Sequence, residues 1–204
     1  MNGGYDAGYL ACPCFWGREP GRLVRHLNRY VPDFRNVIVL DAGCGEGKNA
    51  AFLAERGAHV RAVDVSEVAI KNGKSAFDMK EGVIRWEVED IRSIDLGVEI
   101  YDIVIAYGLL HCLTTEFDVC NVVHKFQAAT RIGGYNVVCA LNSRHQELSA
   151  HPDLTPTLLL HERYVALYSG WEILEVSDTD LTEIHPHNNI SHTHSLTRML
   201  ARKR

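Results

Sequence analysis

The residues best suited to chemistry begin with one short segment, Val39 to Lys48, in which an apolar run ends in Asp-x-Gly-x-Gly-x-Gly. Glycine is needed where a strand turns sharply into a helix and where a ligand lies against the backbone. A carboxylate at Asp41, at the mouth of this turn, favours a cationic amino group and disfavours a pyrophosphate. Lys48 also stands where the dinucleotide-binding fingerprint needs its third glycine. The segment therefore predicts a site for a cofactor with a cationic amino group.

Two more aspartates follow at the ends of the next predicted strands. Asp64 lies 19 residues past Gly45, where a carboxylate accepts hydrogen bonds from both hydroxyls of a ribose. Asp90 and Ile91 end the third strand and are placed to meet an adenine amino group. Each aspartate alone is also compatible with a solvated strand end. Aspartates at three successive strand ends are more specific than the glycine turn, and together they predict a nucleoside-containing cofactor.

Four histidines, His185, His187, His192 and His194, gather on either side of a predicted hairpin turn. Each pair two residues apart shares one face of a strand, so all four line one patch if the register allows. Three interpretations stay open: half-exposed strand residues, a substrate-binding or acid/base role for at least one histidine, or a metal site. We assign no metal ligand on this pattern alone.

Three further side chains are candidates for contact with a ligand. His111 follows the fourth predicted strand, where it either faces a substrate or packs in the core. Tyr9 and Trp16 lie in an irregular N-terminal part. There they form an aromatic lid that attracts a cation through the ring faces, or they simply pack in the core.

The elements that position these residues alternate along the chain. Apolar runs indicate five strands, near residues 36–40, 59–65, 84–91, 101–107 and 135–141. Helix-like patterns lie between and around them, near residues 20–31, 50–56, 66–70, 116–130 and 158–168. Continuous apolar strands separated by helices indicate a parallel sheet that is covered on both faces.

The C-terminal part departs from this alternation. Residues 142–157 are polar and contain two prolines, which predicts a loop over one end of the sheet. Residues 171–185 and 191–201 read as the two strands of a hairpin. We therefore expect a single α/β domain with a mostly parallel seven-stranded sheet, helices on both faces and an antiparallel C-terminal hairpin. Its parts are an N-terminal lid and helix (1–35), a cofactor-binding core (36–142), and a substrate loop with the hairpin (143–204).

Composition narrows the class of protein. A chain of 204 residues is long enough for one α/β domain and too short for two. The net charge of −5 argues against a nucleic acid as partner, and no apolar run is long enough for a membrane helix. The N-terminus shows no signal-peptide pattern, so we expect a cytoplasmic protein. We further expect a monomer or homodimer that acts on a small molecule. Six cysteines without a CxxC pair predict free thiols, with a metal or redox half-site at Cys12 and Cys14 as the alternative.

The segments LDAGCGEGKN, AVDVS, EDI, YDIVIAYGLLHCL and RIGGYNVV, between residues 36 and 142, resemble the ordered motifs of the class I methyltransferases. The resemblance implies a Rossmann-like fold and S-adenosyl-L-methionine as the cofactor. It places the glycines beside the amino-acid part of the cofactor, Asp64 at the ribose and Asp90 at the adenine. The residues expected to bind the cofactor are Asp41, Ala42, Gly43, Cys44, Gly45, Asp64, Val65, Asp90, Ile91, Ala106, Tyr107 and Trp16.

The tail is more specific, since GGYN (133–136), YSGWE (168–172) and LTRMLARKR (196–204) are similar to the tellurite-resistance methyltransferases, the TehB-like family. That resemblance implies methylation of tellurium and selenium oxyanions, and it makes His185 the catalytic candidate. The arginine that follows this histidine in the family is replaced here by Pro186, and a further hairpin arginine falls near Ser191. These changes concern the acceptor and leave the cofactor half untouched.

Several functions compete at this stage. The first is a methyltransferase for a soft nucleophile such as a tellurium or selenium oxyanion or a thiol; an O- or N-methyltransferase of small molecules is its close alternative. An oxidoreductase with a nicotinamide cofactor is disfavoured by Asp41 and Lys48. A non-catalytic module that binds S-adenosylmethionine predicts tight binding without turnover.

Overall fold

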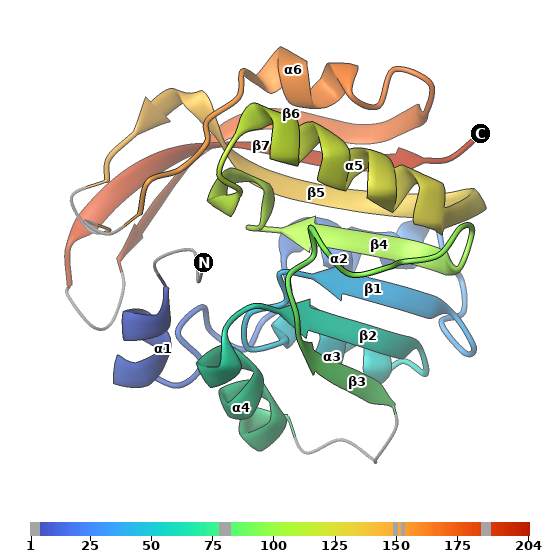
Figure 1. Ribbon diagram of the computed structural model, residues 1–204, viewed down its shortest axis with the longest axis horizontal. Helices are drawn as coiled ribbons and strands as arrows, with labels where there is room; N and C mark the ends of the chain where they lie inside the picture. Colours follow the sequence, from blue (N-terminus) through green and yellow to red (C-terminus); the bar gives the residue numbers. More distant parts are fainter. Residues whose placement is uncertain (1–4, 78–82, 149–150, 152–153, 185–188) are drawn as a thin grey trace.

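The structure, a computed structural model, describes residues 5–77, 83–148, 151, 154–184 and 189–204. Their strands form one sheet in the order β3-β2-β1-β4-β5-β7-β6 (Figure 1). The strands are β1 (Ile38–Ala42), β2 (His59–Asp64), β3 (Ile84–Val88), β4 (Tyr101–Tyr107), β5 (Thr130–Gln146), β6 (Glu172–Ile184) and β7 (Ser191–Arg202). The helices are α1 (Asp6–Ala11), α2 (Arg22–His26), η1 (Leu27–Arg29), α3 (Lys48–Ala54), α4 (Glu67–Ala76), η2 (Leu110–Cys112), α5 (Glu116–Ala129) and α6 (His161–Ala166).

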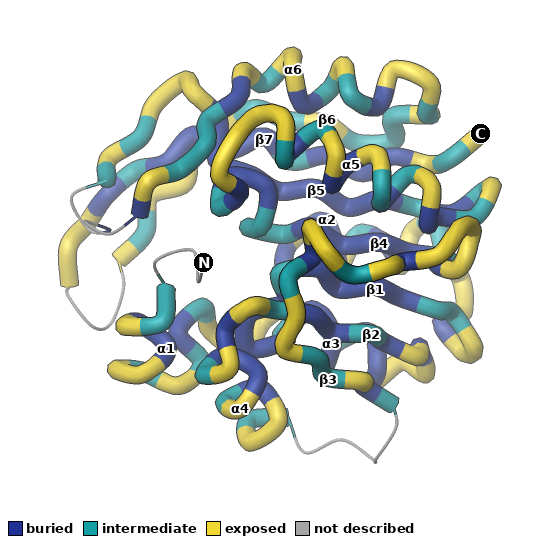
Figure 2. Tube along the Cα trace, in the orientation of Figure 1, coloured by how far each residue is buried: buried dark blue, intermediate teal, exposed yellow. Residues whose placement is uncertain are grey.

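Strand alternation divides the core into two layers, one on each face of the sheet. Leu40 and Val104 belong to the layer that includes the apolar side of α5, whereas Val39 and Ile103 face the layer with α2 and α3. The central strands are accordingly buried along most of their length (Figure 2). This burial on both faces explains why these strands are continuous apolar runs in the sequence, and it confirms the predicted fold class.

Parallel pairing brings the ends of three strands to one edge of the sheet. β1 pairs in parallel with both β2 and β4, so that Ala42 lies opposite Val63 on one side and Ala106 on the other. The glycine turn, Asp64 and Tyr107 therefore follow one another along this edge. The carboxyl ends of parallel strands are where α/β proteins bind their ligands.

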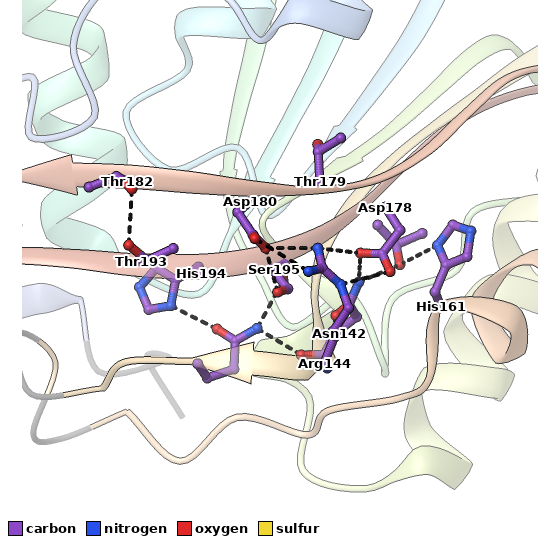
Figure 3. A network of polar contacts seen from close by, with 12 residues as sticks. Asn142, Arg144, His161, Asp178, Thr179, Asp180, Thr182, Thr193, His194 and Ser195 are labelled. Atoms are coloured by element: carbon purple, nitrogen blue, oxygen red, sulfur yellow. Dashed lines mark hydrogen bonds and ion pairs between the residues drawn. The ribbon is translucent and has the colours of Figure 1, made fainter.

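The hairpin of β6 and β7 is antiparallel, as predicted, and β7 pairs with a β5 that is longer than predicted. β5 is longer at both ends, and Arg144 holds its C-terminal extension, because its guanidinium bonds Asp178 Oδ2 (3.0 Å) and Asp180 Oδ1 (2.7 Å) on β6 (Figure 3). Asn142 also donates to Asp178 at 2.8 Å, and Ser195 donates to Asp180 at 2.7 Å. Polar residues that read as a loop are thus bound across the sheet, and the three strands project past the edge where β1 ends (Figure 1).

Three further differences from the sequence prediction bear on the site. β1 continues through Ala42, so Asp41 lies inside the strand rather than at the mouth of the turn. β3 ends at Val88, two residues before Asp90. A short helix, α1, forms in the N-terminal part that was expected to be irregular. No helix among the described residues is long and apolar enough to span a membrane.

Candidate active site

A cavity of about 260 Å³ runs along the edge where the parallel strands end. One end is lined by the glycine turn and the residues that follow β2 and β3, and the other by the hairpin. The lining includes nine of the predicted cofactor residues: Gly43, Cys44, Gly45, Asp64, Val65, Asp90, Ile91, Tyr107 and Trp16. The cavity thus joins residues from three strand ends and from the N-terminal part, as a single ligand site requires.

Left-handed backbone gives the glycine turn its shape. Gly43 has φ of 65° and Gly45 has φ of 54°, which side chains other than glycine rarely adopt. The amides of Gly43 and Cys44 both donate to the carbonyl oxygen of Val63, at 2.8 and 3.0 Å. A Cβ on Gly43 would lie 2.8 Å from the Leu109 Cβ, and one on Gly45 would lie 2.9 Å from the Tyr9 hydroxyl. A side chain at either position would therefore meet atoms that border the cavity.

Asp64 is fixed at the end of β2 by backbone amides. Its Oδ2 accepts from the Gly45 N–H at 2.8 Å and its Oδ1 accepts from the Ser66 N–H at 2.9 Å. Burial raises the pKa of the Asp64 carboxyl, and these amides offset part of that effect. Each carboxylate oxygen has further lone pairs, so the side chain still has capacity to accept from ligand hydroxyls.

Asp90 lines the cavity two residues beyond the end of β3. Arg92 bonds it through two guanidinium nitrogens, with Nε 3.0 Å from Oδ1 and Nη2 2.6 Å from Oδ2, and the Arg92 amide donates to Oδ1 at 2.9 Å. These bonds lower the pKa of Asp90 and keep the carboxylate charged. Arg92, which the sequence analysis did not single out, therefore fixes the orientation of this predicted adenine contact.

Asp41 differs from its prediction. The side chain is 1% exposed, does not line the cavity, and its two carboxylate oxygens have no hydrogen-bond partner within the described ranges. Burial raises the pKa of Asp41 to about 7, and the nearby Ala50 amide and the Lys48 charge offset only part of this. Ala42 and Ala106 are likewise buried in the sheet, outside the cavity lining, because their strands extend to these positions.

The N-terminal part lies over the glycine turn as a strap, residues 5–17. The Glu46 carboxylate accepts from the amides of Cys14 (2.8 Å) and Phe15 (2.6 Å). Lys48 Nζ donates to the carbonyl oxygen of Trp16 at 2.7 Å. The strap therefore brings the rings of Tyr5, Tyr9 and Trp16 into the cavity wall, where the Trp16 indole donates to the Tyr9 hydroxyl at 3.3 Å.

His111 lines the cavity in a fixed tautomer. Its Nδ1 is 3.2 Å from the Leu141 amide, which can only donate, so Nδ1 accepts and Nε2 carries the proton. Burial lowers the pKa of His111 to about 3, with smaller contributions from His194 and His151. The ring is consequently neutral near pH 7, and its basic nitrogen is already used inside the protein.

The hairpin contributes Leu181, Glu183, His194 and Leu196 to the other end of the cavity, and His151 joins them from the segment after β5. The sequence analysis missed Glu183 and His151. Glu183 stands on one side of the predicted turn and could have been found by the same strand alternation that grouped the histidines. His151 stands in a segment without periodicity and gave no signal. His185 and His187 lie outside the described residues, so the catalytic assignment of His185 stays a prediction.

Comparison with known proteins gives a family. A family model described as tellurite resistance protein TehB matches residues 30–194. The chain is 31% identical over 140 residues to Hemagglutinin 1 of Eikenella corrodens, covering 68% of this chain and 45% of that protein. It is 28% identical over 147 residues to the probable S-adenosyl-L-methionine-dependent methyltransferase TehB of Haemophilus influenzae, covering 72% and 50%. The chain thus spans about half the length of the curated relatives it matches.

A solved structure gives the same fold. The crystal structure of TehB from Haemophilus influenzae superposes with a TM-score of 0.74 at 22% identity, covering 90% of this chain and 62% of that one. This likeness confirms the predicted Rossmann-like fold with its C-terminal antiparallel hairpin.

Proposed function

The chain belongs to the TehB family of S-adenosyl-L-methionine-dependent methyltransferases, as predicted, and on this basis we propose that it methylates a small acceptor through a soft nucleophilic atom. The acceptor class is a thiol or an oxyanion of tellurium or selenium. The observation that carries the proposal is the cavity whose cofactor end is built from the glycine turn, and in which the basic nitrogen of His111 is already bonded to the Leu141 amide.

The cofactor end fits S-adenosylmethionine on its own geometry. A Cβ on either left-handed glycine would collide with Leu109 or Tyr9 at the border of the cavity, so only glycine lets the backbone line it. Asp64 has capacity to accept ribose hydroxyls, and Asp90 is held in place by Arg92. When bound, the cofactor supplies an electrophilic methyl group on a positively charged sulfur. The rings of Tyr9 and Trp16 would exclude water from this charge and attract it through their faces.

The state of His111 supports a nucleophile that attacks with a free lone pair. His111 would have to give up its bond to the Leu141 amide before it accepted a proton, and its low pKa disfavours the charged product. Burial raises the pKa of the Glu183 carboxyl, and the charges of His192, Lys48 and Arg198 offset part of that rise, so positive charge is available near the hairpin end. Lys48 also lines the cavity. This charge supports an anionic acceptor. His185 remains our candidate for binding that anion or for accepting a proton.

The test is an acceptor panel assayed for release of S-adenosylhomocysteine: tellurite, selenite, small thiols, phenols and amines. We expect turnover with a thiol or an oxyanion, and much lower rates with phenols and amines. Turnover confined to phenols or amines would replace the proposed acceptor with a hydroxyl or amino group. Tight binding of S-adenosylmethionine without turnover on any acceptor would instead indicate a non-catalytic binding module.

A further inference from the structure

A compact group of metal-ligand residues lies at the hairpin end of the cavity. His151, Glu183, His192 and His194 each offer one ligand atom, and these four atoms all lie within 4.8 Å of one another. The residues come from β6, from β7 and from the segment after β5, so the fold brings together positions more than 40 residues apart in the chain. Three of them, His151, Glu183 and His194, also line the cavity.

Hydrogen bonds on the far side of two imidazoles determine which nitrogen faces the group. His192 Nδ1 lies 2.8 Å from the carbonyl oxygen of Ile190, which can only accept, so Nδ1 carries the proton and Nε2 presents its lone pair. Metal-bound histidines regularly donate their second nitrogen to a carbonyl in this way. The ring of His192 is thus oriented as a ligand.

His194 is oriented in the same way, by a hydrogen bond from its Nδ1 to the side chain of Gln146. Gln146 Nε2 donates to the carbonyl oxygens of Asn142 (2.7 Å) and Ser195 (2.8 Å), which fixes the amide so that its oxygen faces His194. His194 Nδ1 is 2.7 Å from that oxygen and must donate to it, which leaves Nε2 as the ligand atom. Figure 3 shows His194 on β7 at the end of the polar network that contains Asn142 and Ser195.

Distances within the group match those between ligands of one ion. The Nε2 atoms of His151 and His192 are 3.2 Å apart, and Glu183 Oε1 is 3.7 Å from His192 Nε2. Zinc–nitrogen bonds of 2.0–2.1 Å in a tetrahedron place neighbouring ligand atoms about 3.3 Å apart. These two separations are already close to that spacing, and the other ligand atoms, which lie within 4.8 Å of one another, would have to move inward by up to about 1.5 Å to share one ion.

We propose that His151, Glu183, His192 and His194 bind one divalent first-row transition ion, with zinc as the best match. Three imidazole nitrogens and one carboxylate oxygen suit zinc and its neighbours in the series, and exclude calcium and magnesium, which prefer oxygen ligands throughout. The ion lies at the wall of the cavity, opposite the glycine turn. The metal site is argued from its own residues, and its binding of an ion can be measured without methyl transfer. Its test is therefore independent of the proposed acceptor.

Metal binding to the full chain tests the proposal. The protein is stripped with a chelator and titrated with Zn²⁺ by calorimetry, and Co²⁺ is bound in parallel to record its visible absorption. We expect one ion per chain, an intense Co²⁺ band typical of four-coordination, and a higher Tm with Zn²⁺. Less than one ion per chain, or no Co²⁺ band, would overturn the proposal.

Variants locate the site. We expect His192→Ala to weaken Zn²⁺ binding at least 100-fold, and Glu183→Gln, which keeps the shape of the side chain, to weaken it at least 10-fold. His124→Ala is the matched control, because His124 is an exposed histidine on α5. Circular dichroism of the metal-free variants shows whether each one folds, and Glu183→Gln decides the matter if His192→Ala does not. Equal affinity in the control and in a folded Glu183→Gln variant would place the ion elsewhere and contradict the assignment.

Discussion

The two ends of the cavity are built by different means. At the glycine turn, backbone conformation and backbone amides make much of the surface, and Asp64 at the end of β2 is held there by the Gly45 and Ser66 amides. At the hairpin, side chains from three separate segments converge, and the orientation of His194 depends on Gln146 from a neighbouring strand. Backbone geometry tolerates almost no substitution, whereas an assembly of side chains can be altered one group at a time. The first end therefore depends on glycines that few side chains can replace, and the second on side chains that can be changed separately.

The largest effect is expected from Gly43→Val, which attacks the backbone end. A branched side chain at φ of 65° is strained, and its Cβ would lie 2.8 Å from the Leu109 Cβ. We expect binding of S-adenosylhomocysteine to fall more than 10³-fold in calorimetry, without loss of the folded state. Gly170→Ala is the control, because a Cβ there meets nothing within 4 Å. Normal binding by Gly43→Val would show that the turn is only structural.

Asp41→Asn tests the carboxylate buried behind the turn. Because its folded pKa is raised from 3.8 to about 7, stability is expected to fall as pH rises from about 4 to about 7, where the folded protein must lose a proton that it holds in the core. The asparagine variant should lack this slope and be more stable at pH 8 by up to about 4 kcal/mol. Denaturant titrations at several pH values measure this. Parallel pH profiles for the two proteins would refute the raised pKa.

The hairpin end is tested by His185→Ala. We expect turnover to fall about 10²-fold for an acceptor that must lose a proton, and less for one that attacks with a free lone pair. Cofactor affinity should stay unchanged, because the predicted cofactor contacts come from the strap and from the ends of β1 to β4. Initial rates with both kinds of acceptor, beside the exposed-histidine control His124→Ala, give the answer. Unchanged rates with both would remove His185 from the reaction.

Of the four substitutions, Asp64→Ala should have the smallest effect, and it again tests the cofactor end of the cavity. The loss of a charged acceptor at the ribose position is expected to weaken cofactor binding by about 1–3 kcal/mol, measured by calorimetry. Asp95→Ala removes an exposed carboxylate elsewhere and serves as the control. If Asp64→Ala bound the cofactor as the wild type does, the ribose would have to be held by other groups.

The same contrast explains what the sequence could predict. The glycine turn and Asp64 line one cavity, because spacing along adjoining strands is enough to bring them together. Their contact with the cofactor stays a prediction. Asp41 was misplaced because two more residues join β1, and the length of a strand depends on its neighbours. The hairpin was predicted in outline from alternation.

What could not be predicted depends on distant pairing. The extension of β5 through Gln146 rests on Arg144 and its aspartates on β6, 34 and 36 residues away. His151, in the segment after β5, lines the cavity only because β5 and the hairpin extend past the edge of the sheet. Neither the residue types nor their local order contain this information, since a polar segment with prolines is typical of a loop.

The bonds of Glu46 to the strap affect how fast ligands exchange. The Glu46 carboxylate is part of the glycine turn and accepts hydrogen bonds from two backbone amides of the strap. Lifting the strap would therefore break both hydrogen bonds. At about 1.5–3 kcal/mol for each bond to a charged acceptor, the open form would make up under 1% of the population. Departure of the spent cofactor would then wait for this rare opening. If the proposed methyl transfer is faster than this opening, product release sets the rate of repeated turnover.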